Sequence, residues 1–183
     1  MRVIAGERKR YKLNTPRGMK IRPTSDMIKE TLFNMIDSLL FGVVFADIFA
    51  GTGQIGIEAL SRGAEGAVFI DRDREAVSLI KSNLEHVGYS DFARVIQGNL
   101  PGAIAKLSNY NPDIIFMDPP FDSDLYEGVF CELSKIPLKE DCLIICESNI
   151  KKDFSFLNGL GFEIEKTKEY KTSKHIFVRK KDE

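Results

Sequence analysis

The sequence predicts an α/β protein with a Rossmann-like, seven-stranded and mostly parallel sheet that ends in an antiparallel C-terminal hairpin. From Val43 onward, short β-branched runs alternate with helical patterns of about 10–15 residues, which is typical of βαβ units. A glycine-rich loop follows the first of these runs, as in sheets that bind nucleotide cofactors. Helices are expected on both faces of the sheet, and a small N-terminal β-hairpin and helix extension precedes it.

The individual elements follow from apolar periodicity and from the residues that stop it. Strands are predicted at 43–49, 67–71, 93–97, 113–118, 141–148, 162–167 and 174–179. Helices are predicted at 54–62 and 74–87, between the third and fourth strands, between the fourth and fifth strands, and near 152–158. Gly88 ends the second of these helices, and Thr24 or Ser25 can cap an earlier helix that runs to about Ser38.

Length and charge bound the organisation of the chain. Its 183 residues suffice for one ordinary domain with its own core. Residues 1–22 carry eight Lys/Arg and one acid, a net charge of +7. Residues 23–165 carry eleven Lys/Arg and twenty-three acids, a net charge of −12, and residues 166–183 carry seven Lys/Arg and three acids, a net charge of +4. Basic ends favour contact with a polyanion, although such charge can also simply solvate a surface. We therefore divide the chain into a basic arm, 1–22, that contacts RNA, and a domain, 23–183.

Cysteines and apolar stretches indicate the compartment. Cys131, Cys142 and Cys146 are odd in number, and the last two lie in an apolar run, so we expect core thiols and no zinc site. The first residues lack a secretory apolar region, and the most apolar stretch, 39–50, is too short to span a bilayer. The sequence thus predicts a cytoplasmic protein without a membrane partner. We also expect a monomer, because the sheet ends in a hairpin and the sequence offers no self-complementary apolar face.

The loop 47-DIFAGTGQIG-56 carries the first chemical signal. It matches G-x-G-x-x-G between a predicted strand and helix, and Asp71 lies 20 residues after Gly51, where a carboxylate can accept hydrogen bonds from ribose hydroxyls. Asp47, just before the loop, would repel a pyrophosphate but suits a cofactor with a cationic amino-acid end. S-adenosylmethionine is such a cofactor, and Asn99 can bond its adenine, whereas Asp73 is expected to start a helix. The predicted cofactor-binding residues are Asp47, Phe49, Ala50, Gly51, Thr52, Gly53, Asp71, Arg72, Asn99, Leu100 and Asp118.

A second signal, 118-DPPF-121, ends the fourth strand, and strand carboxyl ends are where open α/β sheets hold ligands. Two prolines leave the loop without an N–H at either ring, so it offers acceptors beside an aromatic face. That suits a planar base with an exocyclic amine, whose two hydrogens bond the acceptors while Phe121 stacks on the ring. The predicted catalytic residues are Asp118, Pro119, Pro120 and Phe121, and no metal is required.

Three segments together carry a family resemblance: 47-DIFAGTGQIGIEALSRGA-64, 118-DPPF-121 and 22-RPTSDMIKETLFNMI-36. With them the chain resembles the bacterial 16S ribosomal RNA guanine-N2 methyltransferases of the guanine-966 type, within the class I S-adenosylmethionine-dependent enzymes. The resemblance implies methyl transfer to the N2 amine of one small-subunit guanine, with 16S ribosomal RNA, in a partly assembled small subunit, as the partner. It also implies that Asp118 to Phe121 bind the guanine and that the arm binds RNA.

The arm departs from the family pattern. The family has a glycine followed by an arginine where this chain has Arg10 and Tyr11, and an arginine where it has Met27. Which arm residues touch phosphates is therefore open. The candidates are Lys9, Arg10, Lys12, Arg17, Lys20 and Arg22.

Other functions stay open on the sequence alone. Adenine N6 or a glutamine side-chain amide also presents a planar NH2 group, although related sites for those substrates often begin the tetrad with Asn. A nicotinamide oxidoreductase conflicts with Asp47, and intact motifs argue against a catalytically silent RNA-binding protein. His86 and His175 are isolated and are expected to be structural. Glu147 either lies near the site or is a helix-facing surface acid, and Tyr126 either borders the base or only packs.

Overall fold

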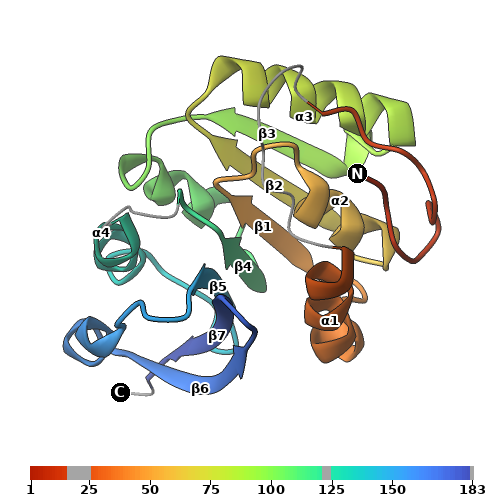
Figure 1. Cartoon of the computed structure of the whole chain (residues 1–183). Coiled ribbons are helices and arrows are strands. Elements are labelled where there is room, and N and C mark those ends of the chain that lie inside the picture. Colours follow the sequence, from red (N-terminus) through yellow and green to blue (C-terminus); the bar gives the residue numbers. More distant parts are fainter. Residues whose placement is uncertain (16–25, 121–124, 182–183) are drawn as a thin grey trace.

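A single seven-stranded sheet forms the centre of the protein. The computed structural model describes residues 1–15, 26–120 and 125–181. Within these ranges the strand order is β3-β2-β1-β4-β5-β7-β6, with β7 antiparallel to both of its neighbours and the other four pairings parallel (Figure 1). The strands are β1 Val44–Ile48, β2 Gly66–Asp71, β3 Ala93–Gln97, β4 Ile114–Met117, β5 Leu143–Asn149, β6 Phe162–Glu169 and β7 Ser173–Lys180. The predicted sheet and its closing hairpin are confirmed.

Strand order locates the place where a ligand can bind. The chain moves from β1 outward to β2 and β3, and then returns to β4 on the other side of β1. Connections that leave β1 and β4 in opposite directions open a crevice at their carboxyl ends. The glycine loop after β1 and the Asp118 turn after β4 border this crevice.

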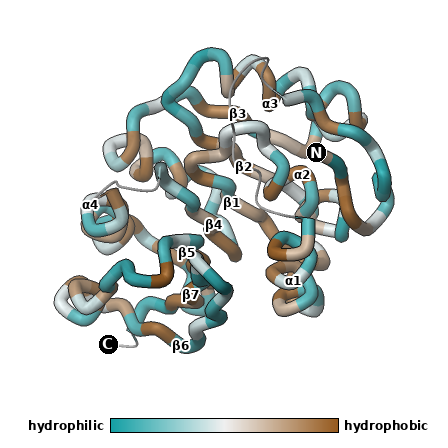
Figure 2. Tube along the Cα trace, in the orientation of Figure 1, coloured by the Kyte–Doolittle hydropathy of each residue, from teal (hydrophilic) through white to brown (hydrophobic). Residues whose placement is uncertain are grey.

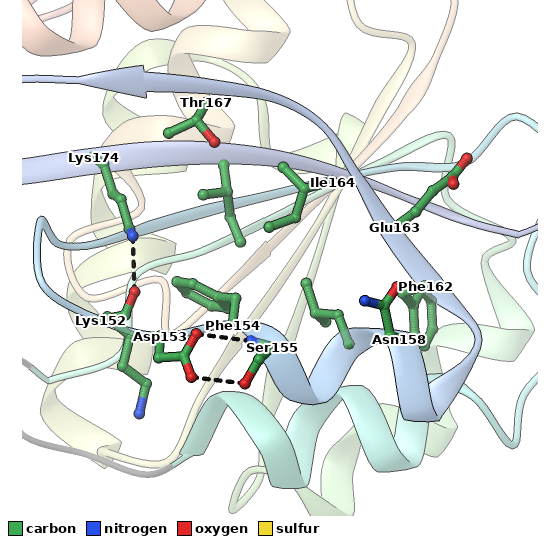
Figure 3. A pocket seen from close by; sticks show the side chains of 12 residues that line it. Lys152, Asp153, Phe154, Ser155, Asn158, Phe162, Glu163, Ile164, Thr167 and Lys174 are labelled. Carbon is green, nitrogen blue, oxygen red and sulfur yellow. Dashed lines mark hydrogen bonds between the residues drawn. The ribbon is translucent and has the colours of Figure 1, made fainter.

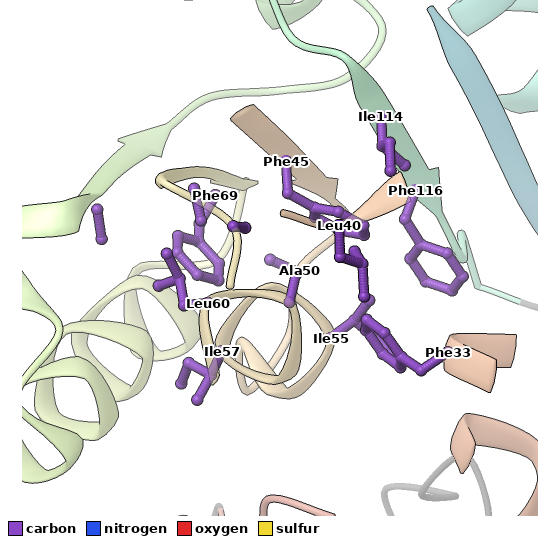
Figure 4. Close-up of a cluster of buried hydrophobic side chains, with 14 of the residues drawn as sticks. Phe33, Leu40, Phe45, Ala50, Ile55, Ile57, Leu60, Phe69, Ile114 and Phe116 are labelled. Atoms are coloured by element: carbon purple, nitrogen blue, oxygen red, sulfur yellow. The ribbon is translucent and has the colours of Figure 1, made fainter. Parts of the chain in front are cut away.

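Helices cover both faces of the sheet, as the sequence predicted. Their bounds are α1 Asp26–Ile36, η1 Asp37–Leu39, α2 Gln54–Ser61, α3 Arg74–Val87, η2 Ser90–Phe92, η3 Gly102–Asn109, α4 Leu125–Leu133 and η4 Ser155–Leu160, where η marks a 3₁₀ helix. Buried side chains of α1, α2 and α3 form one apolar cluster with the sheet (Figure 4), and those of η3, α4 and η4 form a second on the opposite face. Hydrophobic residues accordingly follow the central strands (Figure 2).

The N-terminal segment forms a short version of the predicted hairpin. Arg2 and Lys12 form an antiparallel bridge, and the N–H groups of Val3 and Leu13 donate to the carbonyls of Tyr11 and Met1 at 3.0 and 3.1 Å. Val3 and Leu13 are buried in the α1–α2–α3 cluster, so this stretch packs onto the domain. Residues 16–22 and the predicted caps Thr24 and Ser25 lie outside the described residues. The predicted helix to Ser38 divides into α1 and η1.

Two further expectations concern cysteines and membrane spans. All three cysteines are free thiols. Cys142, just before β5, and Cys146, on β5, are buried, which confirms that these two are core thiols. Burial raises the pKa of the Cys142 thiol to about 12. Among the described helices, none has both the length and the apolar character needed to cross a bilayer.

Candidate active site

The loop after β1 turns sharply into α2. Gly51 and Gly53 have φ angles of +55° and +76°, in the left-handed region that glycine adopts without strain. Gly53 donates its N–H to the Ala50 carbonyl at 2.7 Å and forms the N-cap of α2. Phe49 also has a positive φ, +64°, which is costly for a residue with a bulky side chain and ends β1 one residue before the predicted boundary. Such strain is concentrated where a loop has been shaped for a ligand.

Asp71 holds this loop against the end of β2. Its Oδ2 accepts a hydrogen bond from the Gly51 N–H at 2.8 Å, and its Oδ1 accepts one from the Asp73 N–H at 2.9 Å. Each carboxylate oxygen has two lone pairs, so both oxygens can accept a further bond from a ribose hydroxyl. Asp73 caps α3 by accepting the Glu75 N–H at 3.0 Å, which confirms its predicted helix-start role.

Asp47 lies beneath the glycine loop. Its side chain is buried, and its Oδ2 accepts the Gly56 N–H at 2.9 Å. Burial raises the pKa of Asp47 to about 8, and the nearby carboxylates of Asp71 and Asp118 add to the rise. The fold therefore gathers three acids from the ends of β1, β2 and β4, where a cationic group would relieve their repulsion.

The end of β3 completes the side of the crevice next to β2. Gln97 Nε2 donates to the Arg72 carbonyl at 3.4 Å, which ties the ends of the two strands together. Asn99 follows as an exposed residue whose carbonyl accepts the Ala103 N–H at 2.9 Å, and Leu100 is half-buried. The exposed Asn99 amide is therefore available to a ligand at this end of the crevice.

A cavity of about 290 Å³ lies beside Asp118, and its lining residues come from the turn after β4, from α4, and from the end of β5 and the residues that follow it. Pro119 is buried and Pro120 is exposed, while Phe121 lies outside the described residues. The lining residues are Asp118, Pro119, Tyr126, Ser148, Asn149, Lys151 and Lys152. Tyr126, which the sequence left between packing and the site, does both: it is buried and lines the cavity.

Glu147 is the neighbour of Asp118 that the sequence could not assign. Met117 pairs with Cys146 in the parallel β4–β5 register, so Asp118 and Glu147 follow side by side. Burial and the Glu147 carboxylate raise the pKa of Asp118 to about 8. Glu147 Oε2 lies 3.1 Å from His175 Nε2, and the Tyr170 hydroxyl lies 3.0 Å from His175 Nδ1.

This chain of contacts could not be derived from residue spacing. Glu147 and His175 are direct partners in the antiparallel β5–β7 register, 28 residues apart in sequence. His175 is completely buried, in keeping with the structural role expected of it. It holds the Glu147 side chain in place behind the Asp118 carboxyl.

A larger cavity, of about 480 Å³, lies between η4 and the β6–β7 hairpin (Figure 3). Its lining contains none of the residues that the sequence predicts for cofactor or catalysis. We assign the chemistry to the smaller cavity, because it is the one that Asp118 and Pro119 line.

The basic residues of the N-terminal segment lie elsewhere. The Glu7 N–H donates to the Ser61 carbonyl at 2.7 Å and Arg8 Nε to the Val87 carbonyl at 2.9 Å, and these two acceptors end α2 and α3. Helices that follow parallel strands end at the edge opposite the strands' carboxyl ends, so the exposed Lys9 and Arg10 lie near that edge. Arg17, Lys20 and Arg22 lie outside the described residues.

The raised pKa of Asp118 predicts a pH-dependent stability. A carboxyl with a pKa of about 8 in the folded protein and 3.8 in a model peptide binds its proton more tightly when folded. Its contribution is fully present below about pH 4 and is lost as the pH rises through about 8. Denaturant titrations at pH 5 and pH 9, which span most of the range between the two pKa values, should show that Asp118→Asn gains stability relative to wild type as the pH rises. If the stability difference between Asp118→Asn and wild type is the same at pH 5 and pH 9, the raised pKa of Asp118 is contradicted.

Comparisons with known proteins identify the family of the chain. The model of the family described as "Conserved hypothetical protein 95" matches residues 1–179. "Putative rRNA methyltransferase YlbH" of Bacillus subtilis is 37% identical over 150 residues, which are 80% of this chain and 82% of that protein. "Ribosomal RNA small subunit methyltransferase D" of Escherichia coli is 35% identical over 152 residues, 82% and 76% of the two chains.

Solved structures of methyltransferases are similar to the chain in fold. The one described as "Putative methyltransferase yhhF from Escherichia coli" superposes with a TM-score of 0.84 at 30% identity, covering 100% of this chain and 99% of that one. The resemblance inferred from the glycine loop, the Asp118 tetrad and the α1 segment is thereby confirmed at the level of the family. The chain belongs to the conserved hypothetical protein 95 family and has the class I methyltransferase fold.

Proposed function

We propose that this protein transfers a methyl group from S-adenosylmethionine to the exocyclic N2 amine of one guanine, of the guanine-966 type, in 16S ribosomal RNA. The observation that carries the proposal is the position of the Asp118 carboxyl. It lies at the switch point of the sheet, beside the glycine loop, and lines a cavity with the donor-free Pro119 turn. The family's relatives that are named as ribosomal RNA methyltransferases support RNA as the substrate class.

The residues present fit the proposed cofactor. Gly51 has open space where a Cβ would lie, so a ligand can approach the backbone of the loop closely. Asp71 can accept the ribose hydroxyls, Asn99 can bond the adenine, and Asp47 offers charge to the ammonium of the amino-acid end. Phe49, Ala50, Thr52, Gly53, Arg72 and Leu100 complete the proposed cofactor contacts. Asp118 borders the cofactor, but its acceptors face the substrate amine. S-adenosylmethionine supplies a methyl group bonded to a positively charged sulfur.

The protein's own contribution is orientation of the amine. A carboxyl oxygen of Asp118 and backbone carbonyls of the turn accept the two N–H hydrogens, and Phe121 is expected to stack on the base. The nitrogen lone pair then points at the methyl carbon for an in-line displacement, in which a nitrogen–carbon bond forms and a sulfur–carbon bond breaks. The methylated nitrogen is acidic and releases its proton to water or to Asp118. Pro119 and Pro120 keep competing N–H donors out of the turn.

The identity of the modified nucleoside tests the proposal. Small ribosomal subunits that lack the methyl group, and free 16S RNA, are incubated with labelled S-adenosylmethionine, and the digested nucleosides are separated. We expect the label in N2-methylguanosine. Label in N6-methyladenosine, or in glutamine of the subunit proteins, would assign the protein to the alternative substrates, and absence of label from every substrate would contradict the proposal.

Asp71→Ala should weaken S-adenosylmethionine binding by about 1.5–3 kcal/mol, or about 10- to 150-fold in Kd, the range for a hydrogen bond to a charged group. Calorimetry on the purified protein measures this directly. Asp73→Ala is the matched control, because it removes a neighbouring exposed acid that only caps α3. Equal affinities for the two variants would remove Asp71 from the proposed cofactor site.

The remaining assignments follow from the same proposal. The partner is 16S ribosomal RNA in a partly assembled small subunit, and the enzyme acts as a cytoplasmic monomer without a metal. Arm residues Lys9, Arg10, Lys12, Arg17, Lys20 and Arg22 are proposed phosphate contacts within the arm, 1–22, that precedes the methyltransferase domain.

A further inference from the structure

Five lysines meet at one end of the β6–β7 hairpin, next to the cavity that Asp118 lines. The β5–β7 register pairs Asn149 with Ser173 and Ser148 with Lys174, so the turn between β6 and β7 lies at the carboxyl end of β5. Lys151 and Lys152 follow β5 and line the cavity together with Asp118. We call Lys151, Lys152, Lys168, Lys171 and Lys174 the hairpin-end lysines.

Charge is concentrated at this place. The segments 149–153 and 168–174 contain these five lysines and two acids, Asp153 and Glu169. Lys151, Lys168 and Lys171 are exposed, and the structure records no ion pair for them with any residue in 1–15, 26–120 or 125–181. Lysines at the opposite edge differ: Lys135 pairs with Glu132 at 2.7 Å and Lys139 with Asp113 at 2.6 Å.

The other two lysines are held in position. Lys174 Nζ donates to the Lys152 carbonyl at 2.8 Å (Figure 3) and lies 5.7 Å from the centre of the Phe154 ring. Lys152 Nζ lies 5.7 Å from the centre of the Tyr126 ring, whose hydroxyl donates to the Glu147 carbonyl. Stacking on aromatic faces fixes long side chains that would otherwise lose entropy on binding. Lys152, which lines the cavity, and Lys174, which is bonded to it, are therefore preorganised.

We propose that the hairpin-end lysines bind the phosphates of the RNA strand on either side of the target nucleotide and so hold its base over Asp118. This inference rests on the proposed function and adds a contact surface to it. A base that enters the cavity brings its own backbone phosphates to the rim, where Lys151 and Lys152 lie. The exposed Lys168 and Lys171 extend the positive surface along the strand. Lys9 and Arg10 lie near the opposite edge of the sheet and cannot reach the same phosphates.

The test compares lysines at the turn end of the β6–β7 hairpin with lysines at the opposite edge of the sheet. The variant K151Q/K168Q/K171Q removes three positive charges at the hairpin end. The control K135Q/K180Q/K181Q removes three at the opposite edge, where Lys180 pairs with Phe162 at the far end of β7. Both keep Lys152 and Lys174, whose side chains pack on aromatic rings. Circular dichroism and calorimetry with S-adenosylmethionine confirm that each variant is folded.

Binding of a fluorescein-labelled single-stranded RNA oligonucleotide is followed by anisotropy between about 50 and 200 mM salt. Each lost phosphate contact lowers the slope of log K against log salt by about 0.7. The slope of the hairpin-end variant should therefore fall by about 2, and its RNA affinity at about 0.1 M salt should be about 100-fold weaker. The control should behave as wild type. Equal losses in the two variants, or none in the hairpin-end variant, would overturn the proposal.

A methylation assay separates this inference from the proposed function. On small subunits that lack the methyl group, the hairpin-end variant should raise KM for RNA and leave kcat unchanged. If the wild-type protein binds RNA through these lysines but methylates none, the proposed function fails while the binding surface stands. If methylation is normal in the hairpin-end variant, the surface is wrong and the function stands.

Discussion

Asp118→Ala is expected to lower kcat for methyl transfer by about 10²- to 10⁴-fold while S-adenosylmethionine binding changes little. The Asp118 carboxyl lines the cavity at the end of β4 and is the acceptor that orients the amine of the substrate. Losing a positioned group that acts directly on the reacting atom has effects of this size. A single-turnover assay measures the chemical step, and calorimetry measures the cofactor affinity.

Asp118→Asn is the matched control for this prediction. A carboxamide oxygen still accepts one N–H of the amine, so this variant should retain more activity than Asp118→Ala. Near-normal single-turnover rates for Asp118→Ala would exclude Asp118 from the catalytic site. A large loss of cofactor affinity in Asp118→Ala would instead place the residue in the cofactor pocket alone.

Glu58→Ala is expected to lower the free energy of unfolding by about 3–5 kcal/mol, because it leaves Lys29 as an uncompensated buried charge. Glu58 is completely buried on α2, and its oxygens accept hydrogen bonds from the Ile4 and Ala5 N–H groups at 2.8 and 2.9 Å. Lys29 Nζ lies 3.3 Å and Arg62 Nε 3.0 Å from the same carboxylate. Burial lowers the pKa of Lys29, and the Glu58 charge opposes that shift.

Denaturant titration measures this effect, and Glu165→Ala is its control. Glu165 pairs with Arg179 at 3.0 Å but is exposed, so its loss should cost about 0.2–1 kcal/mol. Because Glu58 binds Ile4 and Ala5, its removal should also release the N-terminal segment, which would appear as faster amide exchange in residues 3–5. Equal stability of the two variants would contradict the role of Glu58 as the anchor of that segment.

Local sequence patterns were sufficient for the sheet and its central loops. Gly51, Gly53 and Asp71 could be placed because a strand, a tight turn, a helix and an acid follow in fixed order, and each pattern is local. Asp118 could be placed for the same reason, since strand carboxyl ends meet at one edge of a parallel sheet. Asp73 could be separated from Asp71 because acids favour the first turn of a helix.

Contacts between distant segments could not be predicted. The pairing of Glu147 with His175 depends on the register of β5 and β7, which no local pattern of a single sequence specifies. The N-terminal segment has the charge of an RNA-binding arm, but Val3 and Leu13 are buried, and the Ile4 and Ala5 N–H groups anchor the segment on α2 by donating to Glu58. The left-handed φ of Phe49 has no sequence signal, because glycine is the residue expected there.

The position and number of the methyl groups added to the small subunit test the central claim most directly. Subunits that lack the modification are incubated with labelled S-adenosylmethionine and wild-type protein, and fragments of their 16S RNA are mapped by mass. The account predicts one methyl group per particle, on the N2 amine of a single guanine, and none with Asp118→Ala. Incorporation at several nucleotides, at an adenine, or at the same level with Asp118→Ala would contradict it.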